Sequence, residues 1–211
     1  MKDNSSVKFI FDKYAKEYQG KYVNVDIYSG TLDLLLELME KDGSRVLDVG
    51  CGPGNISRYL LNKAPLLNIL GIDISENMIS LARENNPEAQ FRIIDCRELR
   101  MLESKFDTVV SGFLAPYLDP DALSDFIKDA YEVLDPGGVI YLSTMDAEKA
   151  DQGFQVSTSS TKETLLTYYH GKSFLRTLLT NNHFEIESIH YLNNPNNVDG
   201  IKDLIFIARK P

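Results

Sequence analysis

The sequence predicts a three-layer αβα sandwich, in which a mostly parallel sheet lies between two layers of helices. Short apolar runs of strand type recur along the chain, helical periodicity separates most of them, and one run ends in a glycine-rich turn. The last two runs are separated only by a polar segment, so they form a hairpin. The expected strands are 45–50, 66–73, 90–94, 106–111, 138–144, 184–190 and 203–209.

Length and composition favour one globular domain. The 211 residues are 43% hydrophobic and 25% charged, which is ordinary for a folded chain. Lys plus Arg total 22 against 31 Asp plus Glu, a net charge of −9, so we expect no nucleic-acid partner. Two cysteines, no metal-ligand pattern and no signal or long apolar run indicate a cytoplasmic protein without membrane insertion. Monomer and homodimer both stay open.

The predicted domain, 1–211, divides into four parts. Residues 1–42 form an N-terminal helical cap, and 43–145 form the core that binds a ligand. Residues 146–171, rich in Ser, Thr and charges, are the place for a lid or a substrate-binding insertion. Residues 172–211 add a helix and the hairpin. Between the last core helix and the fifth strand, Pro136, Gly137 and Gly138 predict a helix stop and a turn.

The run from Val46 to Asn55 is the most informative stretch. Its apolar residues predict a buried strand, and Gly50, Gly52 and Gly54 let the backbone turn without a Cβ. We expect Asn55 to be the N-cap of the following helix, so that free N–H groups face whatever lies over the glycines. The spacing G-x-G-x-G differs from the G-x-G-x-x-G of dinucleotide-binding proteins.

The letters LDVGCGPG resemble motif I of the class I S-adenosylmethionine-dependent methyltransferases, and the resemblance extends from about residue 9 to 210. It implies a Rossmann-like seven-stranded sheet of order 3-2-1-4-5-7-6, with the last strand antiparallel, and S-adenosylmethionine as the cofactor. A glycine turn without a ligand is the alternative. The cofactor residues implied at this motif are Asp48, Gly50, Cys51, Gly52, Gly54 and Asn55.

An acid follows the second strand. Asp73 lies 19 residues beyond Gly54, a spacing that suits a carboxylate accepting from both ribose hydroxyls. The letters GIDIS resemble the family's second motif and imply the same role, with Ile74 and Met78 beside the adenine. Alternatively, Asp73 merely precedes Ser75, the expected N-cap of a helix.

A second acid follows the third strand. The resemblance implies that Asp95 accepts from the adenine amino group, while a helix cap for 97–102 is the alternative. Cys96 is expected to pack beside the adenine rather than act as a nucleophile, because no histidine neighbours it in the sequence.

The segment SGFLAPYL after the fourth strand is similar to the loop of small-molecule methyltransferases and lacks the Asn/Asp-Pro-Pro-Tyr of enzymes that act on exocyclic amino groups. It implies that Ser111, Gly112 and Phe113 border the cofactor and that Tyr117 borders the substrate, or packs under the next helix. The letters FDKYAKEY resemble a segment that folds over the cofactor, which implies Tyr14 and Tyr18 there.

The function implied is in-line methyl transfer from S-adenosylmethionine to a small molecule. Alignment of the reactants can supply about 7 to 11 kcal/mol, so a general base is optional. The alternatives are a methyltransferase-like protein that binds the cofactor without catalysis and, less favoured, an NAD-dependent oxidoreductase. Candidate bases are His170, Tyr169 and Tyr22. Candidate substrate residues are Tyr22, Tyr117, Tyr168 and Tyr169; Tyr18 and Tyr22 could instead only pack the helices together.

Overall fold

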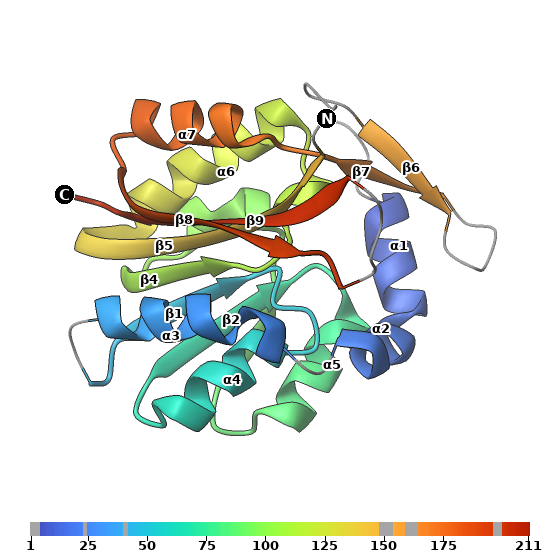
Figure 1. The fold of residues 1–211 in the computed structure, drawn as a ribbon. Coiled ribbons are helices and arrows are strands. Elements are labelled where there is room, and N and C mark those ends of the chain that lie inside the picture. The colour runs from blue at the N-terminus through green and yellow to red at the C-terminus, as the bar shows by residue number, and fades with distance from the viewer. Residues whose placement is uncertain (1–4, 23–24, 40–41, 148–153, 159–163, 196–199) are drawn as a thin grey trace.

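The chain is described by a computed structural model that covers residues 5–22, 25–39, 42–147, 154–158, 164–195 and 200–211 (Figure 1). Its centre is a seven-stranded sheet of order β3-β2-β1-β4-β5-β9-β8. In that order the strands are β3 (Gln90–Ile93), β2 (Asn68–Asp73), β1 (Arg45–Val49), β4 (Phe106–Ser111), β5 (Leu134–Ala147), β9 (Ile201–Arg209) and β8 (Glu185–Asn193).

Strand direction follows the prediction. Strands β1 to β5 are parallel, and β9 is antiparallel to both of its neighbours, β5 and β8. Because β9 is the seventh strand of this sheet along the chain, the predicted order 3-2-1-4-5-7-6 with the last strand antiparallel is confirmed. The carboxyl ends of the parallel strands meet at one edge, where open α/β sheets bind ligands.

Helices cover both faces of the sheet, as Figure 1 shows. Helices α3 (Ser29–Leu38), α4 (Asn55–Lys63) and α5 (Glu76–Asn85) lie on one face, and α6 (Pro120–Val133) and α7 (Lys172–Asn181) lie on the other. Val46 packs in the cluster with α3 and α4, whereas its neighbour Leu47 packs in the cluster with α6 and α7. This alternation follows from the two-residue period of a strand and makes the core two-sided.

The N-terminal cap lies across the ligand-binding edge (Figure 1). It consists of α1 (Ser5–Lys13), α2 (Ala15–Tyr22) and the 3-10 turn η1 (Asp26–Tyr28). One carboxylate oxygen of Asp12 accepts from the Ser75 hydroxyl at 2.5 Å and from the Asn77 backbone N–H at 3.1 Å. The last turn of α1 is thereby fixed to the first turn of α5, beside Asp73.

Two features differ from the prediction. Strands β6 (Phe154–Thr158) and β7 (Thr164–Tyr168) form a separate hairpin inside the predicted insertion, and β7 contacts α1. Helix α6 ends at Val133 as expected, but the Pro-Gly-Gly segment is a bulge within β5 rather than a turn before it. Gly137 supplies the left-handed conformation there, with φ of 81°. The remaining 3-10 turns are η2 (Cys96–Met101) and η3 (Ala115–Tyr117).

The turn between α7 and β8 uses an unusual residue. His183 adopts a left-handed conformation, with φ of 66°, at a position where glycine would carry no steric cost. Its ring lies 6.1 Å from the ring of Tyr131 on α6. The turn therefore forms with a residue other than glycine in the left-handed conformation.

Candidate active site

The glycine turn is tied to the neighbouring strand. The N–H groups of Gly50 and Cys51 both donate to the carbonyl of Ile72, at 2.8 and 3.0 Å. The three glycines have φ values of 66°, 52° and 78°, so each uses the conformational freedom that only glycine has without strain. The turn is rigid because its backbone, rather than its side chains, makes these bonds.

The N-cap of α4 differs from the prediction. Gly54 occupies that position, and Asn55 is the first residue of the helix. The side-chain amide of Asn55 points away from the helix start and donates to the Tyr22 carbonyl at 2.7 Å. Asn55 therefore joins the glycine turn to the end of α2, and the first N–H groups of α4 carry no side-chain cap.

Asp73 stands at the end of β2 over this turn. Its carboxylate accepts from the Gly52 N–H at 3.0 Å and from the Ser75 N–H at 2.9 Å. Burial raises the pKa of Asp73, and the backbone donors partly oppose that rise. Ser75 is the N-cap of α5 and accepts from the Met78 N–H at 3.1 Å. Asp73 therefore also precedes a helix N-cap, as the alternative interpretation expected. Each Asp73 oxygen still has a lone pair for a ligand hydroxyl.

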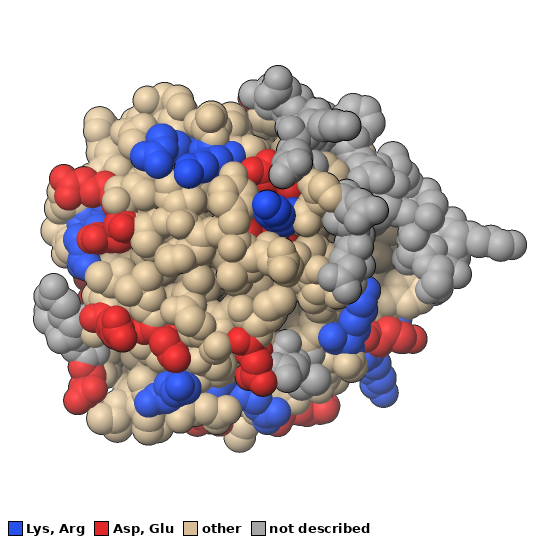
Figure 2. Space-filling model, viewed as in Figure 1, with Lys and Arg blue, Asp and Glu red and all other residues tan. Residues whose placement is uncertain are grey.

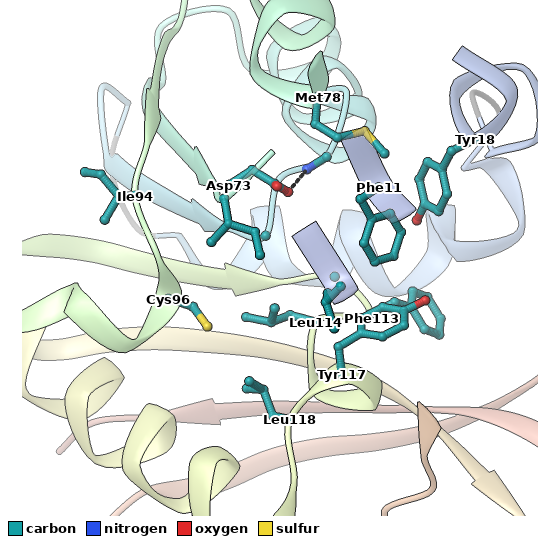
Figure 3. Close-up of a pocket in the computed structure, with 15 residues that line it drawn as sticks. Phe11, Tyr18, Asp73, Met78, Ile94, Cys96, Phe113, Leu114, Tyr117 and Leu118 are labelled. Atoms are coloured by element: carbon teal, nitrogen blue, oxygen red, sulfur yellow. Dashed lines mark hydrogen bonds between the residues drawn. The ribbon is translucent and has the colours of Figure 1, made fainter. Parts of the chain in front are cut away.

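The first hollow of the site lies beside Asp73 and encloses about 660 Å³ (Figure 3). Apolar side chains and Cys96 border it on the sheet side, and aromatic rings from α1, α2 and the β4 loop border it opposite. Its lining includes Phe11, Tyr18, Asp73, Ile74, Met78, Ile94, Cys96, Phe113 and Tyr117. A largely apolar slot with one carboxylate at its edge suits a purine nucleoside.

The second hollow continues from the first and encloses about 1330 Å³. The two share their lining at Tyr18, Gly50, Gly52, Gly112, Phe113 and Tyr117. Beyond this shared wall, the second hollow reaches Asp48 and Asn55. It also reaches a set that we call the acceptor chamber: Tyr22, Tyr28, Tyr141, Ser143, Met145 and Asn194.

Asp48 lies at the floor of the second hollow. Its carboxylate is buried and accepts from the Ser57 hydroxyl at 2.6 Å. Burial raises the pKa of Asp48 to about 6, against the lowering effect of that hydrogen bond. Cys51 also lines the hollow, and burial raises the pKa of its thiol well above the ordinary value. The thiol is thus protonated at neutral pH and unsuited to nucleophilic attack.

The loop after β4 separates the two hollows. Phe113 has φ of 58° and donates its N–H to the Ser143 hydroxyl at 2.9 Å, while its ring lies 5.2 Å from the ring of Tyr28. Gly112 and Phe113 line both hollows, as the resemblance implies. Ser111 differs: it is buried below the loop, lines neither hollow, and its hydroxyl has no partner in the described chain.

Asp95 acts as a helix cap, which is the alternative role considered for it. Its carboxylate accepts from the backbone N–H of Arg97 at 3.0 Å and forms an ion pair with the guanidinium at 2.6 Å. The arginine holds the pKa of Asp95 below its usual range, although burial opposes the effect. Asp95 is the N-cap of η2 and is not among the residues that line the two hollows, whereas its neighbour Cys96 lines the first.

The predicted bases near residue 170 lie outside both hollows. His170 is buried, and its Nε2 lies 3.1 Å from the Ala115 carbonyl and 3.0 Å from the Leu118 carbonyl, so Nε2 carries the proton and donates. Burial lowers the pKa of His170, which keeps the ring neutral. Tyr169 is also buried, and Tyr168 faces a different groove beside α6. His170 therefore positions the η3 loop and is not placed to accept a substrate proton.

Of the predicted aromatic residues near the N-terminus, Tyr18 and Tyr22 line the hollows and Tyr14 does not. Tyr18 lines both hollows and Tyr22 lines the second, with their ring centroids 4.7 Å apart. Tyr14 lines neither hollow; Phe11, one turn earlier, takes that place and contacts the ring of Tyr117 at 5.0 Å. A helical face containing Phe11, Tyr14 and Tyr18 does not by itself say which ring faces inward.

Comparison with known proteins agrees with this geometry. A family profile described as "Methyltransferase domain" matches residues 46–138. A malonyl-[acyl-carrier protein] O-methyltransferase of Enterobacter lignolyticus is 29% identical over 69% of this chain and 56% of its own length. A trans-aconitate 2-methyltransferase of Variovorax paradoxus is 32% identical over 54% and 43%. The chain thus spans about half the length of the curated relatives it matches.

Solved structures match over more of the chain. The crystal structure of an S-adenosylmethionine-dependent methyltransferase from Methanosarcina mazei is 25% identical, covers 83% of this chain and 96% of its own, and has a TM-score of 0.71. In sequence and in fold, the chain is therefore similar to S-adenosylmethionine-dependent methyltransferases. At the level of fold alone, a Synechocystis magnesium protoporphyrin IX methyltransferase with bound S-adenosylmethionine covers all of this chain, with 20% identity and a TM-score of 0.72.

Within this fold, sequence reasoning missed two polar residues that line the acceptor chamber and a carboxylate that lies behind them. Tyr28 donates to one carboxylate oxygen of Asp203 at 2.7 Å, and Asn194 donates to the other at 2.7 Å. Asp203 is buried in β9, beside Met145 of β5. One feature of the sequence could have indicated this cluster, namely an acid within an apolar strand. A carboxylate is rarely buried unless hydrogen-bond donors or an opposite charge accompany it.

Proposed function

We propose that this protein transfers a methyl group from S-adenosylmethionine to a small-molecule acceptor. The observation that supports this most strongly is the placement of Asp73 over the glycine turn, at the edge of a largely apolar slot from which a second hollow continues. The named relatives act on small or carrier-bound acids, which favours a small-molecule acceptor here too.

The residues fit the cofactor in three parts. The Asp73 carboxylate would accept from the ribose hydroxyls, and Ile74, Met78 and Cys96 would enclose the adenine. Gly52 keeps this path open: a Cβ at its position would stand 3.9 Å from the Tyr18 ring and 4.0 Å from the Met78 sulfur, in the space that a ligand would fill. Asp48 and Lys21, the charged side chains among the described residues lining the second hollow, suit the amino and carboxylate groups of the methionine part.

S-adenosylmethionine supplies an electrophilic methyl carbon on a positively charged sulfur. The protein's task is to exclude water and hold the acceptor in line with that carbon, which can be worth about 7 to 11 kcal/mol. Tyr18, Phe113 and Tyr117 lie where the two hollows meet and would fix the acceptor's approach. With His170 and Tyr169 outside the hollows, Tyr22 stays as the candidate base among the three residues considered.

Calorimetry tests the cofactor assignment. We expect saturable binding of S-adenosylmethionine and S-adenosylhomocysteine and no binding of NADH. Saturable NADH binding, with no heat from either sulfur nucleoside, would contradict the proposal and favour an oxidoreductase. Transfer of label from methyl-labelled cofactor to added small molecules then tests catalysis separately.

A cofactor-binding role without methyl transfer is the second candidate. One structure of similar fold is named as a [4+2]-cyclase, with 18% identity and a TM-score of 0.69, so this architecture is not confined to proteins named as methyltransferases. Binding of the cofactor with no labelled product from any acceptor class would favour this candidate over the enzyme.

We also propose a cytoplasmic domain, residues 1–211, that does not bind nucleic acid. In Figure 2, basic side chains on the visible face are scattered among acidic ones, and a broad uncharged area occupies its centre. Such a surface gives little counterion release on a phosphate backbone. None of the helices in the described part of the chain has the length and apolarity needed to cross a bilayer. Salt-sensitive binding of tRNA or duplex DNA would contradict the first point.

A further inference from the structure

The acceptor chamber has a charge character of its own. Of the described residues that line the second hollow, Lys21 and Asp48 carry charge, and neither belongs to the chamber. Lys21 is exposed, with its ammonium 4.9 Å from the ring centroid of Tyr22. The chamber therefore offers no guanidinium or ammonium group to bind a carboxylate or phosphate.

Behind the chamber wall lies a buried carboxylate. Asp203 is held by the Tyr28 hydroxyl and the Asn194 amide, each at 2.7 Å, and both of these residues line the chamber. Among the described residues, no lysine, arginine or histidine forms an ion pair with it. Burial raises the pKa of Asp203, while its two donors favour the charged form. The Coulomb effect of such a group extends farther than in water because little solvent screens it.

Aromatic rings form part of the chamber wall and the wall that it shares with the first hollow. The ring of Tyr28 lies 5.2 Å from that of Phe113, and the ring of Tyr22 lies 4.7 Å from that of Tyr18. Aromatic walls bind planar and cationic groups well, by stacking and by cation–π attraction. Aromatic walls with a carboxylate behind them favour a planar, nitrogen-containing molecule over an anion.

We propose that the methyl acceptor is a planar aromatic amine or nitrogen heterocycle, uncharged or cationic, and that Asp203 sets this preference through Tyr28 and Asn194. The proposal rests on the methyltransferase function proposed above. The acceptor nitrogen forms the new N–C bond, the electron pair of the broken C–S bond stays on sulfur, and the positive charge passes to nitrogen. An amine attacks in its unprotonated form, so an ammonium group first gives one proton to water. A nitrogen that still carries a proton after the transfer loses it to water as well, and a pyridine-type nitrogen keeps the positive charge. A carboxylate behind the chamber stabilises the nitrogen as it becomes positive and opposes the binding of an anion.

The test uses ring-matched acceptor pairs that differ in charge: tryptamine against indole-3-acetate, and nicotinamide against nicotinate. Each is incubated with the full chain and methyl-labelled S-adenosylmethionine, and kcat/KM is measured. We expect transfer to a nitrogen of at least one uncharged or cationic member, at least tenfold faster than to its carboxylate partner. Faster or equal transfer to the carboxylates, or no transfer to either amine-class member, would overturn the proposal.

Variants separate the role of Asp203 from the fold. Asp203→Asn keeps the shape and removes the charge, so the preference within a pair should fall at least fivefold while S-adenosylhomocysteine affinity stays within twofold. Tyr28→Phe removes the hydrogen bond from Tyr28 to Asp203 and leaves β9 unchanged. It should lower the preference for the amine over the carboxylate even if Asp203→Asn fails to fold. Asp125→Asn on the exposed side of α6 is the matched control. An unchanged ratio in both folded variants would overturn the role of Asp203.

Failure of this inference can be told from failure of the proposed function. Loss of S-adenosylhomocysteine binding in the parent protein would remove the methyltransferase assignment itself. Intact binding with label in the carboxylates would leave that assignment standing and overturn only the acceptor class.

Discussion

The two halves of the site are built in different ways. The cofactor half is built around a backbone turn: the N–H groups of the glycine turn donate to Ile72 and to Asp73, and its residues lie close together in the sequence. The acceptor half is made by side chains from distant parts of the chain, such as Tyr28, Tyr141 and Asp203. A site that depends on a glycine turn tolerates few substitutions at that turn, so we expect its ligand to stay the same. A site lined by side chains can change its ligand preference when one side chain is substituted. The four predictions below test this contrast.

The largest effect is expected at Gly54. A Cβ there would stand 2.4 Å from the Asn86 amide nitrogen, and φ is 78°. Gly54→Val combines backbone strain with overpacking, each about 1 to 3 kcal/mol, so the free energy of unfolding should fall by about 2 to 6 kcal/mol. Urea unfolding measures it. Gly30→Val is the matched control, because a Cβ at Gly30 meets nothing within 4 Å; equal losses in both variants would contradict the argument.

Asp73→Ala should weaken cofactor binding next most strongly. The carboxylate can accept two charge-assisted hydrogen bonds from the ribose hydroxyls, so we expect affinity to fall by about 2 to 4 kcal/mol, or roughly 30- to 1000-fold, after water replaces part of the loss. The Gly52 and Ser75 N–H groups also lose their acceptor, which should cost roughly 1 to 3 kcal/mol of stability. Calorimetry with S-adenosylhomocysteine measures the affinity.

The control for Asp73→Ala must be an acid without structural bonds. Asp107 is unsuitable, since its carboxylate accepts from the backbone N–H of Arg45 at 2.8 Å and from its guanidinium at 3.0 Å. Exposed Asp125 on α6 is a better choice. A folded Asp73 variant that binds within about threefold of the parent, a difference below ~0.7 kcal/mol, would mean that Asp73 does not hold the ribose.

Asp48 should make stability depend on pH. Its pKa of about 6 in the folded chain lies above the ordinary value of 3.8, so its stabilising contribution is complete below about pH 4 and is lost as pH rises through 6. Asp48→Asn removes this dependence. Relative to the parent, the variant should therefore gain about 2 to 3 kcal/mol between pH 4 and pH 8 in urea unfolding. If the difference in stability between variant and parent did not change across this range, ionisation of Asp48 in the folded chain would carry no free-energy cost.

The smallest effect is expected in the acceptor half. Thr31 donates its hydroxyl to the Tyr28 carbonyl at 2.9 Å, so the Tyr141 hydroxyl, 3.0 Å away, donates to Thr31. Tyr141→Phe removes one buried hydrogen bond and should cost about 1 kcal/mol, with cofactor affinity unchanged. Tyr59→Phe, whose hydroxyl bonds Asp33 nearer the surface, should cost less. If Tyr141→Phe weakened cofactor binding more than tenfold, the two halves would not be separable.

Local sequence patterns predicted the fold and the cofactor half. The rest of the site depends on contacts between residues far apart in the sequence, which local patterns do not indicate. The strand runs, the glycine turn and Asp73 are neighbours in sequence or follow from the sheet order, so they could be found by spacing. The chamber could not, because Tyr28 meets Asp203 across 175 positions of the chain. His170 looked like a base because a histidine near aromatic residues has the right chemistry, but two backbone carbonyls bind its Nε2. Asn55 failed as an N-cap because Gly54 already takes the left-handed position.

The position of β9 has a consequence for synthesis. This strand leaves the ribosome after every other strand of the sheet, yet it pairs between β5 and β8, along Val139 to Ala147 of β5. Until it arrives, β5 presents an unpaired edge, of the kind that invites pairing with other chains. The nascent chain can form the glycine turn and the Asp73 contacts early, but Asp203 reaches the acceptor chamber only in the final step of sheet assembly. Slow release or crowded expression should therefore expose β5 to aggregation more than any strand of the cofactor half.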